Sequence, residues 1–268
     1  MILLRSVEVR PWQPQQAAGF PFSLDVLRSL HELSFATPVT FFVGENGSGK
    51  STLLEALACA ARSITVGAES VTTDPSLALL RELAQYFKLV WQKRTHRGFF
   101  LRAEDFFGYA RTMRRTQEEL RAALRAVDGE YKGRSALAAD LARLPYRGEL
   151  TDMQRRYGDG LDSRSHGESF LALFQARFVP QGLYLLDEPE AALSPMRQLT
   201  FISMLKQMVG QESQFIIATH SPILLAFPEA TILSFDGGEI RPVRYDELEH
   251  VSLTREFLNH PASFLRHL

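Results

Sequence analysis

Residues 44–52 form a short loop whose composition suits binding of a nucleoside triphosphate. The segment Gly44-Glu-Asn-Gly-Ser-Gly-Lys50-Ser51 fits the pattern G-x-x-x-x-G-K-[ST]. Its glycines let backbone N–H groups turn inward around an anion, and the following helix points its positive end at the phosphates. Lys50 adds a charge for the β- and γ-phosphates, and the Ser51 hydroxyl can ligate Mg²⁺. The expected nucleotide-binding residues are Gly44, Glu45, Asn46, Gly47, Ser48, Gly49, Lys50, Ser51 and Thr52.

An acidic pair, Asp187-Glu188, directly follows the apolar run Leu183–Leu186. In a parallel sheet, ligands bind beyond the carboxyl ends of the strands. Asp187 would therefore lie beside the phosphate loop and hold Mg²⁺, directly or through water. Glu188 lies one residue further out, where it could act as a general base or orient the attacking water. Two solvated acids in a turn are the alternative, which the phosphate loop disfavours.

Thr219-His220 follows a second apolar run, Phe215–Ala218. His220 should therefore emerge on the same rim and reach the γ-phosphate or the attacking water. The other histidines have no such placement and no metal-like clustering, so we interpret them as surface or packing residues. They are His31, His96, His250, His260 and His267, whereas His166 is considered separately below.

The pattern of apolar runs predicts an α/β fold of the P-loop NTPase type. Apolar, non-alternating strands followed by helices indicate a mostly parallel core sheet covered on both faces, with an N-terminal antiparallel β portion. Residues 1–62 and 165–268 should form the core. Residues 63–164 should form an inserted helical lobe without a long coiled coil. The expected strands are 1–10, 33–43, 182–186 and 215–219, with a hairpin over 230–243; the expected helices are 51–62, 76–93, 105–127, 135–144, 167–178, 195–209 and one within 246–267.

Composition sets further bounds on the class of protein. The net charge of the 268 residues is −1, which excludes a global polycation or polyanion. A surplus of basic residues between Lys88 and Arg156 could meet an anionic partner or form a solvated helical face. Cys59 is the single cysteine, so an intrachain disulfide is impossible. No apolar stretch approaches the roughly 18–20 residues of a membrane span. We therefore expect a cytoplasmic protein without direct membrane insertion.

Together, the phosphate loop, the strand ending in Asp-Glu-Pro and the strand ending in Thr-His resemble the ABC-type ATPase domain. The likeness is greatest to its SMC/RecF-like branch and to a small stand-alone group of AAA-type predicted ATPases. The resemblance implies ATP hydrolysis with ATP and Mg²⁺, and a homodimer with two ATP molecules between its subunits. It assigns catalysis to Glu188 and His220, and Mg²⁺ binding to Ser51 and Asp187.

The same resemblance implies roles for three other segments. Ser165, His166, Gly167 and Glu168 stand where the family carries its signature, which binds the γ-phosphate held by the opposite subunit. Ser165 matches the signature serine and Gly167 its second glycine, whereas His166 and Glu168 replace a glycine and a glutamine. Residues 190–193 resemble the D-loop of the dimer interface. Residues 101–105 stand at the Q-loop, where Glu104 could substitute for the Mg²⁺-contacting glutamine, with Arg102 as the alternative contact.

The biological output is less specified by sequence. We favour a switch or clamp acting on DNA or RNA in maintenance or defence, in keeping with the resemblance and the basic segment. The alternative is a regulatory module that controls a separate effector protein. A transporter subunit is less favoured because the signature and Q-loop glutamine depart from the usual pattern. A small-molecule kinase would share the phosphate loop alone.

Overall fold

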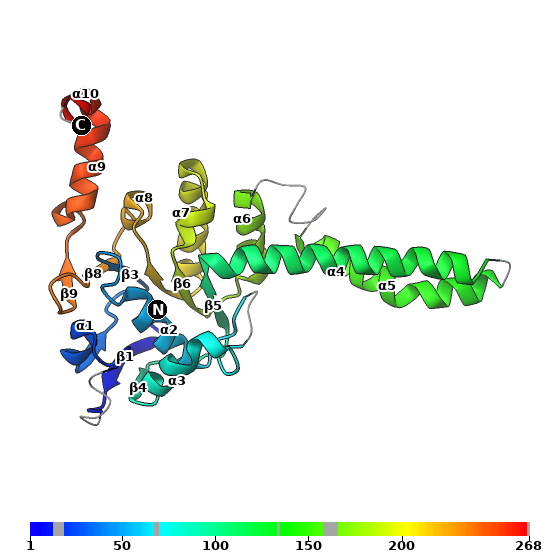
Figure 1. The fold of residues 1–268 in the computed structure, drawn as a ribbon, viewed down its shortest axis with the longest axis horizontal. Coiled ribbons are helices and arrows are strands. Elements are labelled where there is room, and N and C mark those ends of the chain that lie inside the picture. The colour runs from blue at the N-terminus through cyan, green and yellow to red at the C-terminus, as the bar shows by residue number, and fades with distance from the viewer. Residues whose placement is uncertain (13–18, 67–69, 133–134, 158–165, 267–268) are drawn as a thin grey trace.

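A six-stranded sheet forms the centre of the computed structural model, which describes residues 1–12, 19–66, 70–132, 135–157 and 166–266 (Figure 1). Its strand order is β5-β6-β7-β3-β8-β9, and every neighbouring pair is parallel except β8 and β9. The strands are β3 (Val39–Val43), β5 (Gly98–Arg102), β6 (Leu183–Asp187), β7 (Gln214–Ala218), β8 (Thr231–Ser234) and β9 (Arg241–Val243). The predicted mostly parallel core is confirmed.

Alternating residues of β3 enter two different hydrophobic cores. Phe41 packs with α6 and α7 on one face, whereas Phe42 packs with α2 and the small sheet on the other. Both rings are fully buried, and burial of each contributes about 1.5–3 kcal/mol. Because both faces are covered, the strand is apolar at nearly every position, which explains why the sequence lacks polar alternation there.

A second sheet has three antiparallel strands in the order β2-β1-β4. It packs with α2 in the hydrophobic core on one face of the central sheet. Its strands are β1 (Leu4–Val9), β2 (Glu32–Ser34) and β4 (Phe87–Trp91). The buried amide of Gln214 joins this sheet to β7, since its Oε1 accepts from the backbone N–H groups of Leu3 and Leu4 at 2.9 and 2.7 Å. The predicted antiparallel portion is confirmed. The predicted single strand over 33–43 is wrong, because β2 and β3 belong to different sheets.

The helices that flank the sheets follow the predicted order. The predicted helix over 76–93 is wrong in its second half, because residues from Phe87 to Trp91 pair with β1 instead. The hairpin predicted over 230–243 is formed by β8 and β9. The helices other than the projecting pair are α1 (Asp25–Arg28), α2 (Lys50–Ala61), η1 (Pro75–Leu77), α3 (Ala78–Ala84), α6 (His166–Arg177), η2 (Pro189–Ala192), α7 (Pro195–Gly210), α8 (Pro222–Leu225), η3 (Tyr245–Glu247), α9 (Glu249–Asn259) and α10 (Pro261–Leu265).

Two long helices, α4 (Ala103–Glu130) and α5 (Ala136–Tyr157), lie side by side and project far beyond the sheets (Figure 1). Both are longer than the predicted helices over 105–127 and 135–144, and α5 continues through Pro145. The predicted lobe over 63–164 also contains β4 and β5, which belong to the two sheets. The projecting part is therefore the hairpin α4–α5 alone.

Candidate nucleotide-binding and hydrolysis site

The predicted site residues follow neighbouring strands at one edge of the central sheet. In the parallel register Asp187 of β6 pairs with Arg102 of β5 on one side and with Ala218 of β7 on the other. Ala218 pairs in turn with Phe42 of β3. The phosphate loop, the acidic pair and His220 all begin just beyond these positions, so the sheet brings together segments far apart in sequence.

The phosphate loop connects β3 to α2 and wraps around the side chain of Lys50. Gly44, Gly47 and Gly49 have φ values of +145°, +84° and +98°, which L side chains rarely adopt. Lys50 Nζ donates to the carbonyl oxygens of Gly44 and Glu45 at 2.7 and 2.8 Å. Burial lowers the pKa of Lys50, although the acids around it oppose that shift. The loop thus holds a buried ammonium group at the start of a helix.

The outer part of the loop is held by an acid that sequence reasoning missed. Asp236, just past the end of β8, accepts a hydrogen bond from the backbone N–H of Glu45 at 2.8 Å. A Cβ at Gly44 would lie 2.9 Å from the same carboxylate. Asn46 and Gly47 are exposed at the loop's tip, and Thr52 is half-buried in the first turn of α2. Only the position of Asp236 at a strand end could have indicated this role.

Ser51 and Asp187 meet across the floor of the site. Ser51 Oγ donates to Asp187 Oδ1 at 3.1 Å. Burial raises the pKa of Asp187 to about 6, while the hydrogen bond from Ser51 opposes the shift and the nearby Glu188 adds to it. A hydroxyl and a carboxylate are hard oxygen donors, which are the ligands that Mg²⁺ prefers.

Glu188 and His220 stand together above this floor. Their closest side-chain atoms, Glu188 Oε1 and His220 Nε2, are 4.0 Å apart. Glu188 has a left-handed backbone, with φ 48° and ψ 50°, and its N–H donates to the carbonyl of Ala218 at 2.9 Å. That conformation turns the side chain out of the strand direction, at a cost of about 1–3 kcal/mol. Burial lowers the pKa of His220, and Lys50 lowers it further, so the imidazole is neutral near pH 7.

The carboxyl group of Glu190 fixes the backbone of this corner. Glu190 Oε1 accepts from the N–H of His220 at 2.7 Å, and burial raises the pKa of Glu190. From sequence, the family resemblance indicated Glu190 only as part of the D-loop-like segment 190–193. Ser48 Oγ and His220 Nε2 are two of the six buried side-chain atoms without a hydrogen-bond partner in the described part of the chain, and Glu190 Oε2 is a third. The first two are the potential donors of this corner, so they suit an acceptor-rich ligand such as a polyphosphate.

The described residues Gly167 and Glu168 of the signature-like segment lie against α7. Ser165 falls outside the described residues, and His166 begins α6. A Cβ at Gly167 would lie 2.8 Å from the side chain of Arg197 and 3.0 Å from the carbonyl oxygen of Ala192. Glu168 Oε1 pairs with Arg197 Nη2 at 2.7 Å.

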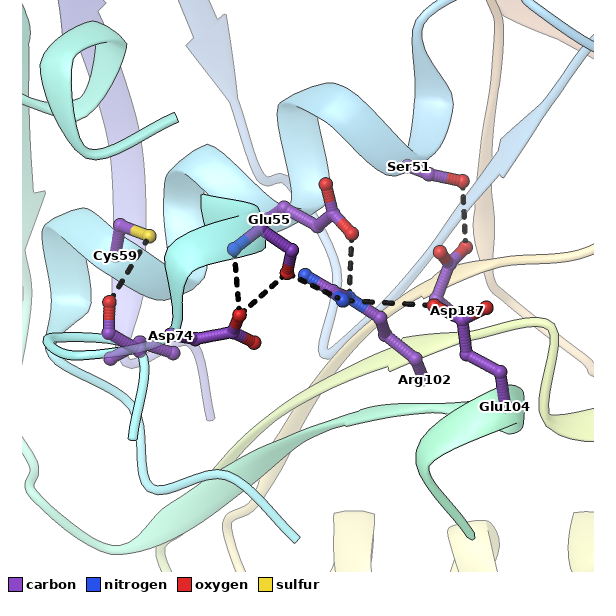
Figure 2. A network of polar contacts seen from close by, with 9 residues as sticks. Ser51, Glu55, Cys59, Asp74, Arg102, Glu104 and Asp187 are labelled. Atoms are coloured by element: carbon purple, nitrogen blue, oxygen red, sulfur yellow. Dashed lines mark hydrogen bonds and ion pairs between the residues drawn. The ribbon is translucent and has the colours of Figure 1, made fainter. Parts of the chain in front are cut away.

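Arg102 connects the sheet edge to the root of the projecting hairpin (Figure 2). Its Nε lies 2.6 Å from Glu55 Oε1 of α2, and both side chains are largely buried. Its Nη1 lies 3.6 Å from Glu104 Oε1, whose side chain is 77% exposed. Burial raises the pKa of Glu55 to about 7, while Arg102 opposes that shift. Of the two predicted Q-loop contacts, Arg102 is thus the more buried and lies beside Asp187 in the sheet.

Comparison with known proteins shows the family to which the chain belongs. An AAA domain family matches residues 23–134. The hemin import ATP-binding protein HmuV of Pseudomonas fluorescens is 32% identical over 219 residues, which cover 78% of this chain and 76% of HmuV. This chain belongs to the ABC-type ATPase family. The cobalt import ATP-binding protein CbiO of Salmonella typhimurium is 27% identical to the ATPase over 247 residues, covering 87% of this chain and 83% of CbiO.

The fold of the ATPase also matches solved structures that include an Smc head domain from Pyrococcus furiosus. That match has 12% identity and a TM-score of 0.48, and it covers 96% of this chain and 100% of the other. The family assignment rests on the sequence relatives. It confirms the predicted ABC-type resemblance, and with it ATP binding and ATP hydrolysis as the activity of this enzyme. In the part of the chain that the structure describes, every helix is too short or too polar to cross a bilayer.

Proposed function

We propose that this ATPase is Mg²⁺-dependent and works as a homodimer that holds two ATP molecules between its subunits. The observation that carries the proposal is the placement of Lys50, Ser51, Asp187, Glu188 and His220 beyond the ends of three neighbouring strands. Because these strands are parallel, the five side chains gather at one end of the central sheet, where ligands of such sheets bind.

Each side chain has a role that its surroundings support. Lys50 binds the β- and γ-phosphates, since its ammonium group already lies against the loop. Glu188 orients the attacking water or accepts its proton. His220 is neutral and 4.0 Å from Glu188, so its free Nε2 can hydrogen-bond the γ-phosphate or that water. Glu190 acts through His220 by fixing its backbone.

Ser51 and Asp187 are the residues that fit the Mg²⁺ ion. Their oxygens are 3.1 Å apart on the floor of the site. Within the described residues no cluster of three or more His, Cys, Asp or Glu could hold a metal by itself. Phosphate oxygens and water would therefore complete the coordination, as is usual for Mg²⁺. When bound, the ion neutralises charge that develops on the phosphate oxygens. Glu104 is a further candidate ligand, because its Oε1 lies 3.6 Å from Nη1 of Arg102, and Arg102 pairs with Asp187 in the sheet.

The second subunit supplies the signature-like segment, comprising Ser165, His166, Gly167 and Glu168. Gly167 belongs to the first turn of a 12-residue helix, whose positive end suits an anion. Arg197 braces that turn through Glu168. Because Gly167 and Glu168 lie against Arg197 of α7, a twofold pairing would bring this segment onto a γ-phosphate held by the other subunit. Closure of the dimer then depends on ATP, whose contacts favour the closed state.

A Glu188→Gln variant tests the hydrolysis site and the dimer together. We expect ATP affinity to be kept, ATP turnover to fall by about 100-fold or more, and a stable dimer to form with Mg·ATP. Glu229→Gln is the matched control, because Glu229 also has a left-handed backbone, with φ 60°, but precedes β8 at the opposite edge of the sheet. Turnover at the parent rate in Glu188→Gln would remove Glu188 from catalysis.

The hairpin α4–α5 is the part of the molecule that favours a protein as the recipient of this cycle. Its two described helices carry nine arginines and nine acidic residues. Several of these charges pair locally, such as Arg143 with Asp128 at 2.7 Å. Leu137, Leu141 and Leu144 are 58–70% exposed at helical spacing on α5. A charge-balanced hairpin with an apolar stripe suits a protein partner better than a phosphate backbone.

We therefore propose an ATP-dependent switch that acts on a separate protein through the hairpin. A soluble effector protein is the first candidate for that partner. A membrane subunit of a transporter is the second, because HmuV and CbiO are named as import ATP-binding proteins. Affinity purification of the tagged Glu188→Gln protein with Mg·ATP, from soluble and detergent-extracted fractions separately, distinguishes the two. Loss of the partner on Leu141→Glu would support docking on the stripe. Salt-sensitive binding of DNA or RNA, without a protein partner, would instead restore the nucleic-acid hypothesis.

A further inference from the structure

Helix α9 presents an apolar face that the described part of the chain leaves largely exposed, apart from the ring of Phe257, which packs edge-on against Phe264 of α10. Leu253, Phe257 and Leu258 are 54%, 38% and 71% exposed. Figure 1 shows α9 and α10 rising from the sheet edge at which the phosphate loop lies. The base of α9 is fixed, because Val251 is buried in the core and Arg255 pairs with Asp246 at 3.0 Å. The bare face is thus held at a defined position.

This face continues into a hollow at the nucleotide edge. The hollow has a volume of about 690 Å³ and is lined by the start of the phosphate loop, by His220 and by the first turns of α9. Leu253 belongs both to the lining and to the exposed face. The wall also carries an excess of acids over Arg241. These acids are Glu45, Asp236, Glu247 and Glu249.

A second exposed apolar patch lies beside the signature-like segment. Met196 and Leu199, in the first two turns of α7, are 72% and 54% exposed. Between them in sequence is Arg197, which contacts Glu168 and covers Gly167. The positive ends of α6 and α7, of 12 and 16 residues, lie next to this patch.

We infer that α9 of one subunit packs against Met196 and Leu199 of a second copy of this chain. The inference rests on the proposed dimer, in which the phosphate loop of one subunit faces Gly167 of the other. Leu253 lies in the hollow beside the phosphate loop, and Arg197, between Met196 and Leu199 in sequence, contacts Gly167 and Glu168. The pairing of the loop with Gly167 therefore brings α9 close to Met196 and Leu199. The exposed face of α9 then meets the patch on α7, and the acidic hollow meets the positive end of α7, while that of α6 faces the γ-phosphate. Both apolar and charge complementarity favour a second copy as the occupant.

The contact would make α9 a clasp that stabilises the closed, ATP-bound dimer without touching the nucleotide. Leu253 and Phe257 lie four residues apart, so they face the partner together. Opening of the dimer after hydrolysis would expose both apolar surfaces again. Mutations of α9 outside the hollow, such as at Phe257, should therefore change the dimer's affinity but leave nucleotide binding by the monomer intact.

The first test uses the Glu188→Gln protein, which holds ATP, and measures dimer dissociation constants by sedimentation with and without Mg·ATP. We expect Phe257→Glu to weaken the ATP-dependent dimer by about tenfold or more, with unchanged binding of a fluorescent ATP analogue, because Phe257 is 38% exposed and lies outside the lining of the hollow. Leu79→Glu is the matched control, since Leu79 is 46% exposed on α3, away from the nucleotide edge. An equally tight dimer in the Phe257→Glu variant would overturn the inference and leave the dimer itself standing.

The second test is a cross-link between subunits. In a Cys59→Ser background, Leu253→Cys and Met196→Cys proteins are mixed and oxidised. A covalent dimer that forms only with Mg·ATP supports the contact. No cross-link in a mixture that sedimentation shows to be dimeric refutes it. If the Glu188→Gln protein stays monomeric with Mg·ATP, the proposed dimer fails and this inference fails with it.

Discussion

The buried pair of Glu55 and Arg102 should stabilise the fold in a way that depends on pH. The two groups are 2.6 Å apart, and their side chains are 16% and 11% exposed. Removing one partner of such a pair leaves an uncompensated buried charge and costs about 3–5 kcal/mol. We expect Arg102→Met to lower the free energy of unfolding by about 3 kcal/mol at pH 8.

The pH dependence follows from the raised pKa of Glu55, about 7 in the folded protein against an ordinary 4.5. A raised folded-state pKa gives stability that is full below the unfolded pKa and is lost as pH rises through about 7. Without Arg102 the carboxyl group holds its proton to higher pH still. At pH 5.5 the group is neutral in both proteins, so the loss in Arg102→Met should shrink to about 1 kcal/mol.

Urea unfolding at both pH values measures these differences, and Glu55→Gln completes a double-mutant cycle. The double variant should lose at least about 1 kcal/mol less than the sum of the single losses. Arg114→Met is the control, because the pair of Arg114 and Glu118 is 61% and 62% exposed and should contribute about 0.5 kcal/mol at most. Additive losses, or an Arg102→Met loss no larger than the control's, would refute the reasoning.

Three further outcomes are expected. Lys50→Ala should weaken ATP binding by about tenfold or more, because a charge-assisted contact is lost; unchanged affinity in calorimetry would contradict the phosphate-loop assignment. Chelation of Mg²⁺ should abolish ATP turnover. The Mg²⁺ concentration for half-maximal activity should rise about tenfold from pH 7 to pH 5, since protons compete with Mg²⁺ for Asp187 below its pKa of about 6. A Mg²⁺ requirement that does not change with pH would argue against Asp187 as the ligand. Gly98→Ala should lower the free energy of unfolding by about 3 kcal/mol or prevent folding, because the added Cβ would lie 1.8 Å from the carbonyl oxygen of Leu183. The control Gly108→Ala, on the exposed side of α4, should raise the free energy of unfolding by about 0.5–1 kcal/mol.

The sequence predicted the catalytic edge because its residues follow buried strands. The carboxyl ends of parallel strands lie at the same end of a sheet. Asp187 and His220 could therefore be assigned to one rim without knowing the strand order. The glycine spacing before Lys50 predicted the phosphate loop for a similar reason, since few other backbones turn so many N–H groups inward. The bounds of α2, β6 and β7 agree with prediction to within one or two residues.

Features that depend on distant partners were missed. Phe87–Trp91 adjoins a helix in sequence, and only its pairing with β1 makes it a strand. The pairing of Glu55 with Arg102 and of Asp236 with the Glu45 backbone requires knowledge of which strands are neighbours. The length of α5 was underestimated because Pro145 ordinarily ends a helix, whereas packing against α4 supports the helix beyond it.

The direct junction of β5 with α4 makes the hairpin a lever arm. Arg102 ends the strand and Ala103 begins the helix, so no loop separates the nucleotide edge from the arm. At about 1.5 Å per residue the 28 residues of α4 span about 42 Å. A tilt of about 5° at the first turn would therefore displace the far end by about 4 Å. Sub-ångström adjustments around the phosphates would be amplified into a movement large enough to disengage a bound protein.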